Sequence, residues 1–283
     1  ARLHLFVMPW PFRSTSVSRG FLCGLGALAL FGAASARALW PLPLLWTEKL
    51  TPGPGDAVLN LYFLEWGQHQ IGLGLPSFWD ANFYFPVRGA FTLSDHLFGP
   101  ALQLFLLRPL LPSPVAGYNL LFFTSFVLSG LSTAWVARRM GASRPASLLA
   151  GGMFAFCPMR WDQLSHLQVL LMQWLPLALW HFDRLLVERS ARRGAIFLGF
   201  YLLNLTGGSY LAYMLHVPLL ALAVVPMLRL PMAAYLEAGT RVDVTGQLDM
   251  VQTRFNADLA RALLLLVLGA LLRRVLARVP MPV

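Results

Sequence analysis

Long apolar runs alternate with short arginine-rich segments along most of this chain. A helix needs about 20 predominantly apolar residues to cross the ~30 Å hydrocarbon layer of a membrane. The apolar windows predict spans over 20–46, 97–112, 115–137, 145–159, 167–187, 194–208 and 209–229. A last window, 259–278, fits either a span or a basic amphipathic helix on the membrane surface. The pattern therefore predicts an all-α fold: a polytopic membrane helical bundle of about six to eight apolar segments.

Composition supports a membrane protein. Hydrophobic residues make up 57% of the 283 residues and charged residues only 12%, whereas about 25% charged is usual for soluble domains. The net charge is +10, and Lys49 is the only lysine among the 22 basic residues. The arginines lie between apolar runs. This pattern is typical of basic loops that orient a membrane protein and not of a nucleic-acid-binding surface. Richness in Arg, Ala and Leu is typical of a GC-rich bacterial genome, which predicts a multi-pass protein of the bacterial inner membrane.

The arginine clusters predict the orientation of the chain. Clusters at 138–144 and 184–193 are expected on the cytoplasmic side, and the acidic, Gly- and Pro-rich loop 47–96 on the outside. Two spans between 97 and 137 would place the first cluster outside. Segment 97–112, which contains Arg108 and Pro109, is the weaker of the two, and a re-entrant or interfacial segment is the alternative to a span there.

The same patterns divide the chain into four parts. These are a cytoplasmic N-terminal segment 1–19, a transmembrane module 20–229 with the exported loop 47–96, a polar cytoplasmic segment 230–258, and a basic amphipathic or membrane-associated helix 259–283. A cleavable signal peptide ending near Ala34-Ser35-Ala36 is an alternative interpretation of the first apolar run. Cys23 and Cys157 lack metal-binding spacing and are predicted to be free thiols.

Candidate chemistry concentrates in the exported loop. Segment Val58–Ile71 has aromatic residues at helical spacing and is predicted to be a helix lying in the outer interface, with Asp56 at its N-cap. Capping alone is the alternative role for that carboxylate. Further acids, amides and aromatics follow, including Glu65, Asp80, Asn82 and His96. Such a mixture is found in sugar-binding sites, although an interfacial aromatic belt explains the rings equally well.

A second polar cluster lies between the windows 145–159 and 167–187. Arg160 is suited to binding a phosphate, His166 to carrying a proton, and Gln168 is an amide in an apolar segment. The alternative is that Arg160 and His166 extend to the interface and pair with Asp162. A further polar segment, 204–210, is predicted to be an outer turn. Phosphate-loop, nucleophile-elbow and zinc motifs are absent from the sequence, which disfavours soluble nucleotide chemistry.

The order of these segments carries a family resemblance over about residues 20–229. An arginine-flanked first span is followed by Gly55-Asp56, LNLYFLEW, FWDANFYFP, SDHLFGPAL, WVARRMGASRPASLLAGGMFAFCPMRWDQLSHLQ and GGSYLAYML. This succession resembles bacterial members of the C-type glycosyltransferase superfamily (GT-C), which use polyprenyl-phosphate sugars. The resemblance implies a polyprenyl-phosphate sugar as donor, membrane lipids as surroundings, and an acceptor at the outer face.

The resemblance also implies a role for Asp56, which matches the catalytic acidic residue of the first exported loop. From the chemistry of such a transfer, Asp56 would be the general base, Arg160 would stabilise the leaving phosphate, and His166 would orient that phosphate. The expected substrate contacts are Glu65, Asp80, Asn82, His96 and Gln168. Some branches of the superfamily use a divalent metal and others do not, and both alternatives stay open here.

The chain departs from that family in its second half. Relatives usually carry further spans and often an exported C-terminal domain, whereas this chain turns polar after residue 230. A non-catalytic structural or accessory subunit of a larger membrane protein complex is therefore the alternative function. A transporter is a third hypothesis, disfavoured because the acids cluster in a loop and not at mid-span.

Overall fold

The computed structural model describes residues 17–51, 53 and 55–238, and every regular element among them is a helix. The chain divides into two compact units, Ala1–Val224 and Val225–Val283. The described residues of the second unit continue the last helix as far as Ala238. The elements are α1 (Val17–Ala38), η1 (Leu42–Leu44), α2 (Asp56–Leu73), η2 (Ala90–Leu93), α3 (Phe98–Leu107), η3 (Arg108–Leu110), α4 (Pro114–Arg139), α5 (Arg144–Ala155), α6 (Pro158–Asp162), α7 (Leu167–Leu170), η4 (Met172–Trp174), α8 (Leu175–Glu188), α9 (Ala191–Leu205) and α10 (Ser209–Ala238).

Serine caps fix where three of these helices begin. The side chains of Ser113, Ser143 and Ser190 accept hydrogen bonds from backbone N–H groups in the first turns of α4, α5 and α9. These bonds satisfy donors that have no partner within the helix. α2 ends at Gly74, whose φ of 82° is a left-handed conformation that glycine adopts without strain.

Close packing of α1, α4 and α5 depends on two glycines. Phe31 of α1 is 2% exposed and lies against Gly130 of α4 and Gly151 of α5. A Cβ atom at Gly151 would collide with the Gly130 carbonyl oxygen and would lie 2.7 Å from the Phe31 Cζ. Small residues of this kind let helix backbones approach each other closely, as they do in membrane helix bundles.

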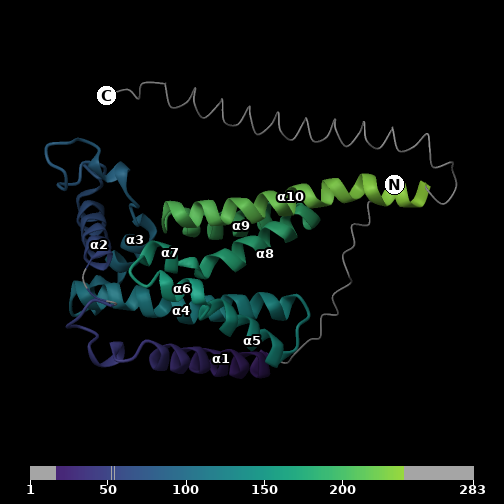
Figure 1. Cartoon of the computed structure of the whole chain (residues 1–283), viewed down its shortest axis with the longest axis horizontal. Coiled ribbons are helices and arrows are strands. Elements are labelled where there is room, and N and C mark those ends of the chain that lie inside the picture. Colours follow the sequence, from purple (N-terminus) through teal and green to yellow (C-terminus); the bar gives the residue numbers. More distant parts are fainter. Residues whose placement is uncertain (1–16, 52, 54, 239–283) are drawn as a thin grey trace. The chain divides into compact units, whose positions relative to one another are not determined.

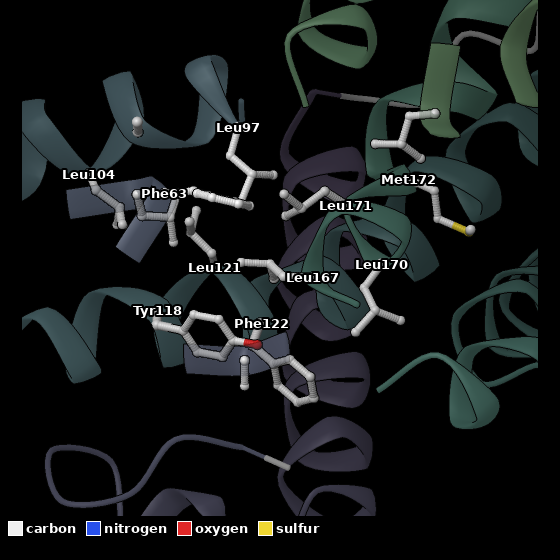
Figure 2. Close-up of a cluster of buried hydrophobic side chains, with 14 of the residues drawn as sticks. Phe63, Leu97, Leu104, Tyr118, Leu121, Phe122, Leu167, Leu170, Leu171 and Met172 are labelled. Atoms are coloured by element: carbon white, nitrogen blue, oxygen red, sulfur yellow. The ribbon is translucent and has the colours of Figure 1, made fainter. Parts of the chain in front are cut away.

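The largest cluster of buried side chains lies on the other side of α4. It joins α2, α3, α4 and the segment 167–172, and Figure 2 shows part of it. The labelled residues are Phe63, Leu97, Leu104, Tyr118, Leu121, Phe122, Leu167, Leu170, Leu171 and Met172. A smaller cluster packs Leu215 and Leu219 of α10 against Ala178 of α8 and the aromatic side chains of α9.

The first unit has two opposite ends: one carries two helical hairpin turns, and the other carries the N-terminus of α2. α4 and α5 form one antiparallel hairpin, α8 and α9 form another, and α2 runs across the direction that α1, α4 and α8 share (Figure 1). The two hairpin turns lie at the same end, because Trp135 of α4 stacks on His181 of α8. That end carries the arginine clusters 138–144 and 184–193, and the N-terminus of α2 lies at the other end (Figure 1).

Helix lengths modify the predicted set of spans. Among the described residues, α4 is the helix long and apolar enough to cross a membrane, and Cys23–Ala38 and Ser209–Val224 form shorter apolar helices. α5, α8 and α9 have 12, 14 and 15 residues, fewer than the roughly 17 that a span requires. The helix bundle is confirmed, and its multi-pass membrane character stays a prediction.

Two predicted segments have a different form. The window 167–187 is wrong as one continuous helix, because it is broken into α7, η4 and the beginning of α8. α3 has ten residues, too few for a span, and packs on α2, which favours the alternative that 97–112 is re-entrant or interfacial. The helix predicted over Val58–Ile71 is confirmed within α2. Predictions for 1–16 and 239–283 lie outside the described residues.

Candidate functional site

The central feature of the candidate site is a contact between Asp56 and His166. The His166 Nε2 atom lies 2.9 Å from the Asp56 Oδ2 atom, and the two side chains are 35% and 51% exposed. The predicted N-cap role of Asp56 is wrong. Gly55 is the N-cap, with a φ of 99°, and Asp56 is the first residue of α2 without a capping hydrogen bond. The carboxylate is therefore free to pair with the imidazole.

A second contact holds the same two segments together. Asn60 lies one turn after Asp56 on α2, is 2% exposed, and its Nδ2 donates to the Ser165 carbonyl oxygen at 3.3 Å. Residues at i and i+4 share one face of a helix. The first turns of α2 thus hold both the side chain of His166 and the backbone immediately before it. Asn60 and Ser165 were not among the predicted site residues, although the i+4 spacing from Asp56 could have identified Asn60.

The contacts indicate which tautomer the neutral imidazole adopts. Since Asp56 accepts from Nε2, the neutral ring carries its proton there and leaves the Nδ1 lone pair unprotonated. Nδ1 lies 3.4 Å from the Ser165 hydroxyl, which is a weak interaction at most. An Asp–His pair of this kind can accept a proton from a hydroxyl group placed beside Nδ1.

Arg160 is buried and contacts residues of α4. Its guanidinium is 0% exposed, donates to the hydroxyls of Ser125 at 3.0 Å and Ser129 at 3.2 Å, and stacks over the Phe126 ring at 4.2 Å. A phosphate could not contact Arg160 without a change in packing.

Glu65 pairs with Arg108 instead of lying beside Asp56. The two side chains are 3.0 Å apart, and Glu65 also accepts from Gln68 at 2.8 Å. This group lines a small cavity of about 100 Å³ between α2, η3 and the beginning of α4. Glu65 is therefore a residue of a different pocket.

Asp80 and Asn82 have contacts within the loop. Asp80 accepts from the Gly89 N–H at 2.7 Å, and Asn82 accepts from the Tyr62 hydroxyl. Both contacts tie the loop 74–97 to itself or to α2. Their predicted roles as substrate contacts stay predictions.

His96 is packed between rings. It lies edge-on to Trp79 and Phe78, and its Nδ1 accepts from the Phe98 N–H at 3.1 Å. Burial lowers the pKa of His96 because it disfavours the charged form, and neighbouring Asp95 offsets this in part.

Asp95 and Gln168 meet at the beginning of α10. Asp95 is 7% exposed and accepts from the Ser209 N–H at 2.6 Å and from the Ser209 hydroxyl. A Cβ atom at Gly208 would lie 3.1 Å from the Gln168 Cβ, so the turn predicted at 204–210 packs closely against α7. The buried Gln168 Oε1 atom has no hydrogen-bond partner in the described part of the chain.

Within the described residues, no three His, Cys, Asp or Glu side chains form a group that could hold a metal ion. Cys23 and Cys157 are free there, as predicted.

Comparison with protein-family models, with curated proteins and with solved structures found no match. The function is therefore inferred from the residues, the geometry of the site and the resemblance described above.

Proposed function

We propose that this protein transfers a sugar from a polyprenyl-phosphate donor to an acceptor hydroxyl at the outer face of the bacterial inner membrane. One observation carries the proposal: the 2.9 Å contact between Asp56 and His166, from two separate polar segments that were each expected to be exported. Both side chains are partly exposed, so a substrate can reach them. The identity of the donor comes from the GT-C resemblance.

The chemistry assigns each partner one step. The His166 Nδ1 atom accepts the proton of the acceptor hydroxyl while that oxygen forms a bond to the anomeric carbon of the sugar. The bond from the anomeric carbon to the phosphate oxygen breaks, and the lipid phosphate leaves with the electron pair. Asp56 fixes the imidazole tautomer and stabilises the imidazolium that forms. Both residues keep catalytic roles, with the proton now assigned to the pair and not to Asp56 alone.

Several features support a membrane location with several spans. The chain has 57% hydrophobic residues, α4 is long enough to cross, and α1, α4 and α5 meet at glycines. The arginine-rich hairpin turns lie at the end of the unit away from α2, whose first residue is Asp56 (Figure 1). This separation supports the proposal of a cytoplasmic basic side and an exported catalytic side.

The second candidate function is an accessory subunit of a larger membrane protein complex. It is favoured by large apolar side chains that no part of the described chain covers. Phe85 is 86% exposed, Leu110 80% and Leu106 70%. Surfaces of this kind mark contacts with a partner or with lipid.

Sugar transfer by the purified full chain, reconstituted in lipid with a panel of radiolabelled polyprenyl-phosphate sugars, tests the proposal. We expect Asp56→Asn and His166→Gln each to lower the rate by about 10²–10⁴-fold, the usual contribution of general acid–base catalysis. Asp162→Asn is the matched control, because Asp162 is an exposed acid near His166 in sequence with no hydrogen-bond partner among the described residues.

Wild-type protein that is folded but transfers no sugar from the panel, and that co-purifies with a second membrane protein, would support the accessory-subunit function. Equal rates in the wild type and in both variants would remove the Asp56–His166 pair from the mechanism. Loss of transfer in Asp162→Asn as well would mean that the effect is not specific to the pair.

A further inference from the structure

The turn between α8 and α9 encloses an open hollow at the arginine-rich end of the first unit. Leu185, Leu186, Arg189, Ser190, Ala191 and Gly194 line it, and its volume is about 460 Å³. Its walls are mainly apolar, and Arg189 is the charged residue at its edge. An apolar hollow with a cation at its rim is suited to a ligand that has both a negative charge and hydrocarbon.

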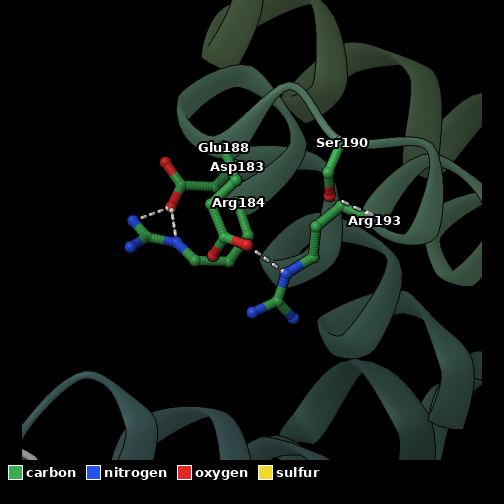
Figure 3. Close-up of polar contacts among 5 residues, drawn as sticks. All are labelled: Asp183, Arg184, Glu188, Ser190 and Arg193. Atoms are coloured by element: carbon green, nitrogen blue, oxygen red, sulfur yellow. Dashed lines mark hydrogen bonds and ion pairs between the residues drawn. The ribbon is translucent and has the colours of Figure 1, made fainter.

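The ion pairs around this turn leave positive charge in excess. Arg184 pairs with Asp183, and the Arg193 Nε atom lies 2.7 Å from the Glu188 Oε2 atom (Figure 3). Arg193 also lowers the pKa of Glu188, so this carboxylate is ionised at neutral pH. The two acids of the turn are thus already neutralised by two arginines.

Two further arginines in the turn have no such partner. Arg189 and Arg192 are exposed, and their side chains make no ion pair or hydrogen bond with any described residue. The first turn of α9 contains no acidic residue, and the Ser190 hydroxyl accepts a hydrogen bond only from the Arg193 N–H. The positive end of the 15-residue helix α9 therefore adds to the charge of these two guanidinium groups.

The neighbouring surface is typical of a membrane interface. Arg184 stacks on Trp180, and Arg139 at the end of α4 stacks on Trp135. Tryptophan and arginine side chains are enriched where helices meet lipid headgroups. Basic pockets between helices on the cytoplasmic side of membrane proteins bind anionic lipid headgroups.

We infer that the α8–α9 turn binds the phosphate headgroup of an anionic phospholipid, with Arg189 and Arg192 contacting the phosphate and the hollow accepting the adjoining hydrocarbon. The inference rests on the membrane location proposed above and is independent of the sugar-transfer chemistry. It assigns a function to the end of the molecule away from the Asp56–His166 pair.

The test measures thermal stabilisation of the purified full chain in non-ionic detergent by three probes: dioctanoyl phosphatidylglycerol, dioctanoyl phosphatidylcholine and glycerol phosphate. Each is titrated against the wild type and Arg189→Gln/Arg192→Gln. The matched control is Arg37→Gln/Arg88→Gln, which removes the same charge from two exposed arginines elsewhere. Separately, fractionation of cells establishes whether the protein is in the membrane.

We expect wild-type protein to bind phosphatidylglycerol at least about tenfold more tightly than phosphatidylcholine. The reason is that each basic residue near an anionic headgroup makes the binding free energy more favourable. The Arg189/Arg192 variant loses this preference and the control keeps it. Equal binding of both lipids, equal loss in the control, or glycerol phosphate binding as tightly as the lipid would each overturn the inference. A protein that does fractionate with membranes but shows one of these results would refute the headgroup site alone. A protein absent from membranes would refute the proposed location as well.

Discussion

Arg160 brings a guanidinium into the interior, where two serine hydroxyls and one aromatic ring surround it. A buried charge without an anionic partner is often replaced by an apolar side chain of similar length at little cost, whereas truncation leaves a cavity. We expect Arg160→Met to change the free energy of unfolding by less than about 1 kcal/mol, and Arg160→Ala to lower it by about 3 kcal/mol. Chemical denaturation measures both.

The same pair of variants tests the phosphate-stabilising role that was predicted for Arg160. If the guanidinium only packs, Arg160→Met keeps full sugar transfer. If Arg160→Met is as stable as wild type yet inactive, the guanidinium must reach the substrate through a rearrangement of α6.

His96 should give the protein a stability that depends on pH. Its pKa is lower in the folded protein than the ordinary value of about 6.5, so between these two values the unfolded chain binds more protons. The contribution of His96 to the free energy of unfolding is fully present above pH 6.5. It is lost as the pH falls from 6.5 through the lower pKa of His96 in the folded protein. We expect the melting temperature of wild type to drop more steeply from pH 7.5 to pH 5 than that of His96→Gln. Parallel curves for the two proteins would contradict this.

At the scale of single residues, the sequence predicted which polar residues belong to a site but not which residues they contact. Asp56 and His166 were both predicted as catalytic, and the structure brings them together. Glu65 and Arg160 were predicted for the same site, but Glu65 pairs with Arg108 and Arg160 donates to two serines of α4. Such pairings depend on contacts between residues 31 to 43 positions apart in the chain, which no local pattern encodes.

At the scale of helices, α4 and α5 offer a comparison between adjacent glycines. A Cβ atom at Gly151 would meet the Gly130 backbone and Phe31, whereas a Cβ at Gly152 would meet nothing within 4 Å. We expect Gly151→Ala to lower the free energy of unfolding by about 1–3 kcal/mol through overpacking. Gly152→Ala should be neutral or raise it by up to about 1 kcal/mol, because alanine favours the helix. Equal effects in the two variants would refute the close packing of α1, α4 and α5.

The helix boundaries show what local signals can and cannot predict. Ser-Pro at 113–114 and Ser-Arg-Pro at 143–145 precede α4 and α5, and such signals are readable in the sequence. The interruption of the helix expected over 167–187 was not predicted. A hydropathy window averages the hydrophobicity of its residues and is insensitive to the geometry of the backbone. Pro176 lies in the first turn of α8, so the helix that was expected to be continuous begins again there.

At the scale of the whole molecule, the separation of arginines from the Asp56–His166 pair predicts a fixed orientation. In a background of Cys23→Ser and Cys157→Ser, we introduce Ser94→Cys in the exposed loop or Met140→Cys in the α4–α5 turn, where Met140 is 55% exposed. A membrane-impermeant maleimide should label the Ser94→Cys protein in intact cells. It should label the Met140→Cys protein only after permeabilisation.

Labelling of both positions in intact cells would contradict the orientation. Labelling of neither before permeabilisation, followed by release of the protein in the soluble fraction, would contradict the membrane location itself. The basic amphipathic helix predicted over 259–283 plays no part in this test.

The contact of Asp95 with Ser209 joins residues that are 114 positions apart in the chain. During synthesis the loop 74–97 leaves the ribosome long before the beginning of α10, so Asp95 has no Ser209 to pair with while the hairpins between them are being made. The contact between this loop and α10 can therefore form only late in translation. Until then the loop lacks this partner, and nascent chains that stop before residue 209 should be substrates for quality-control proteases.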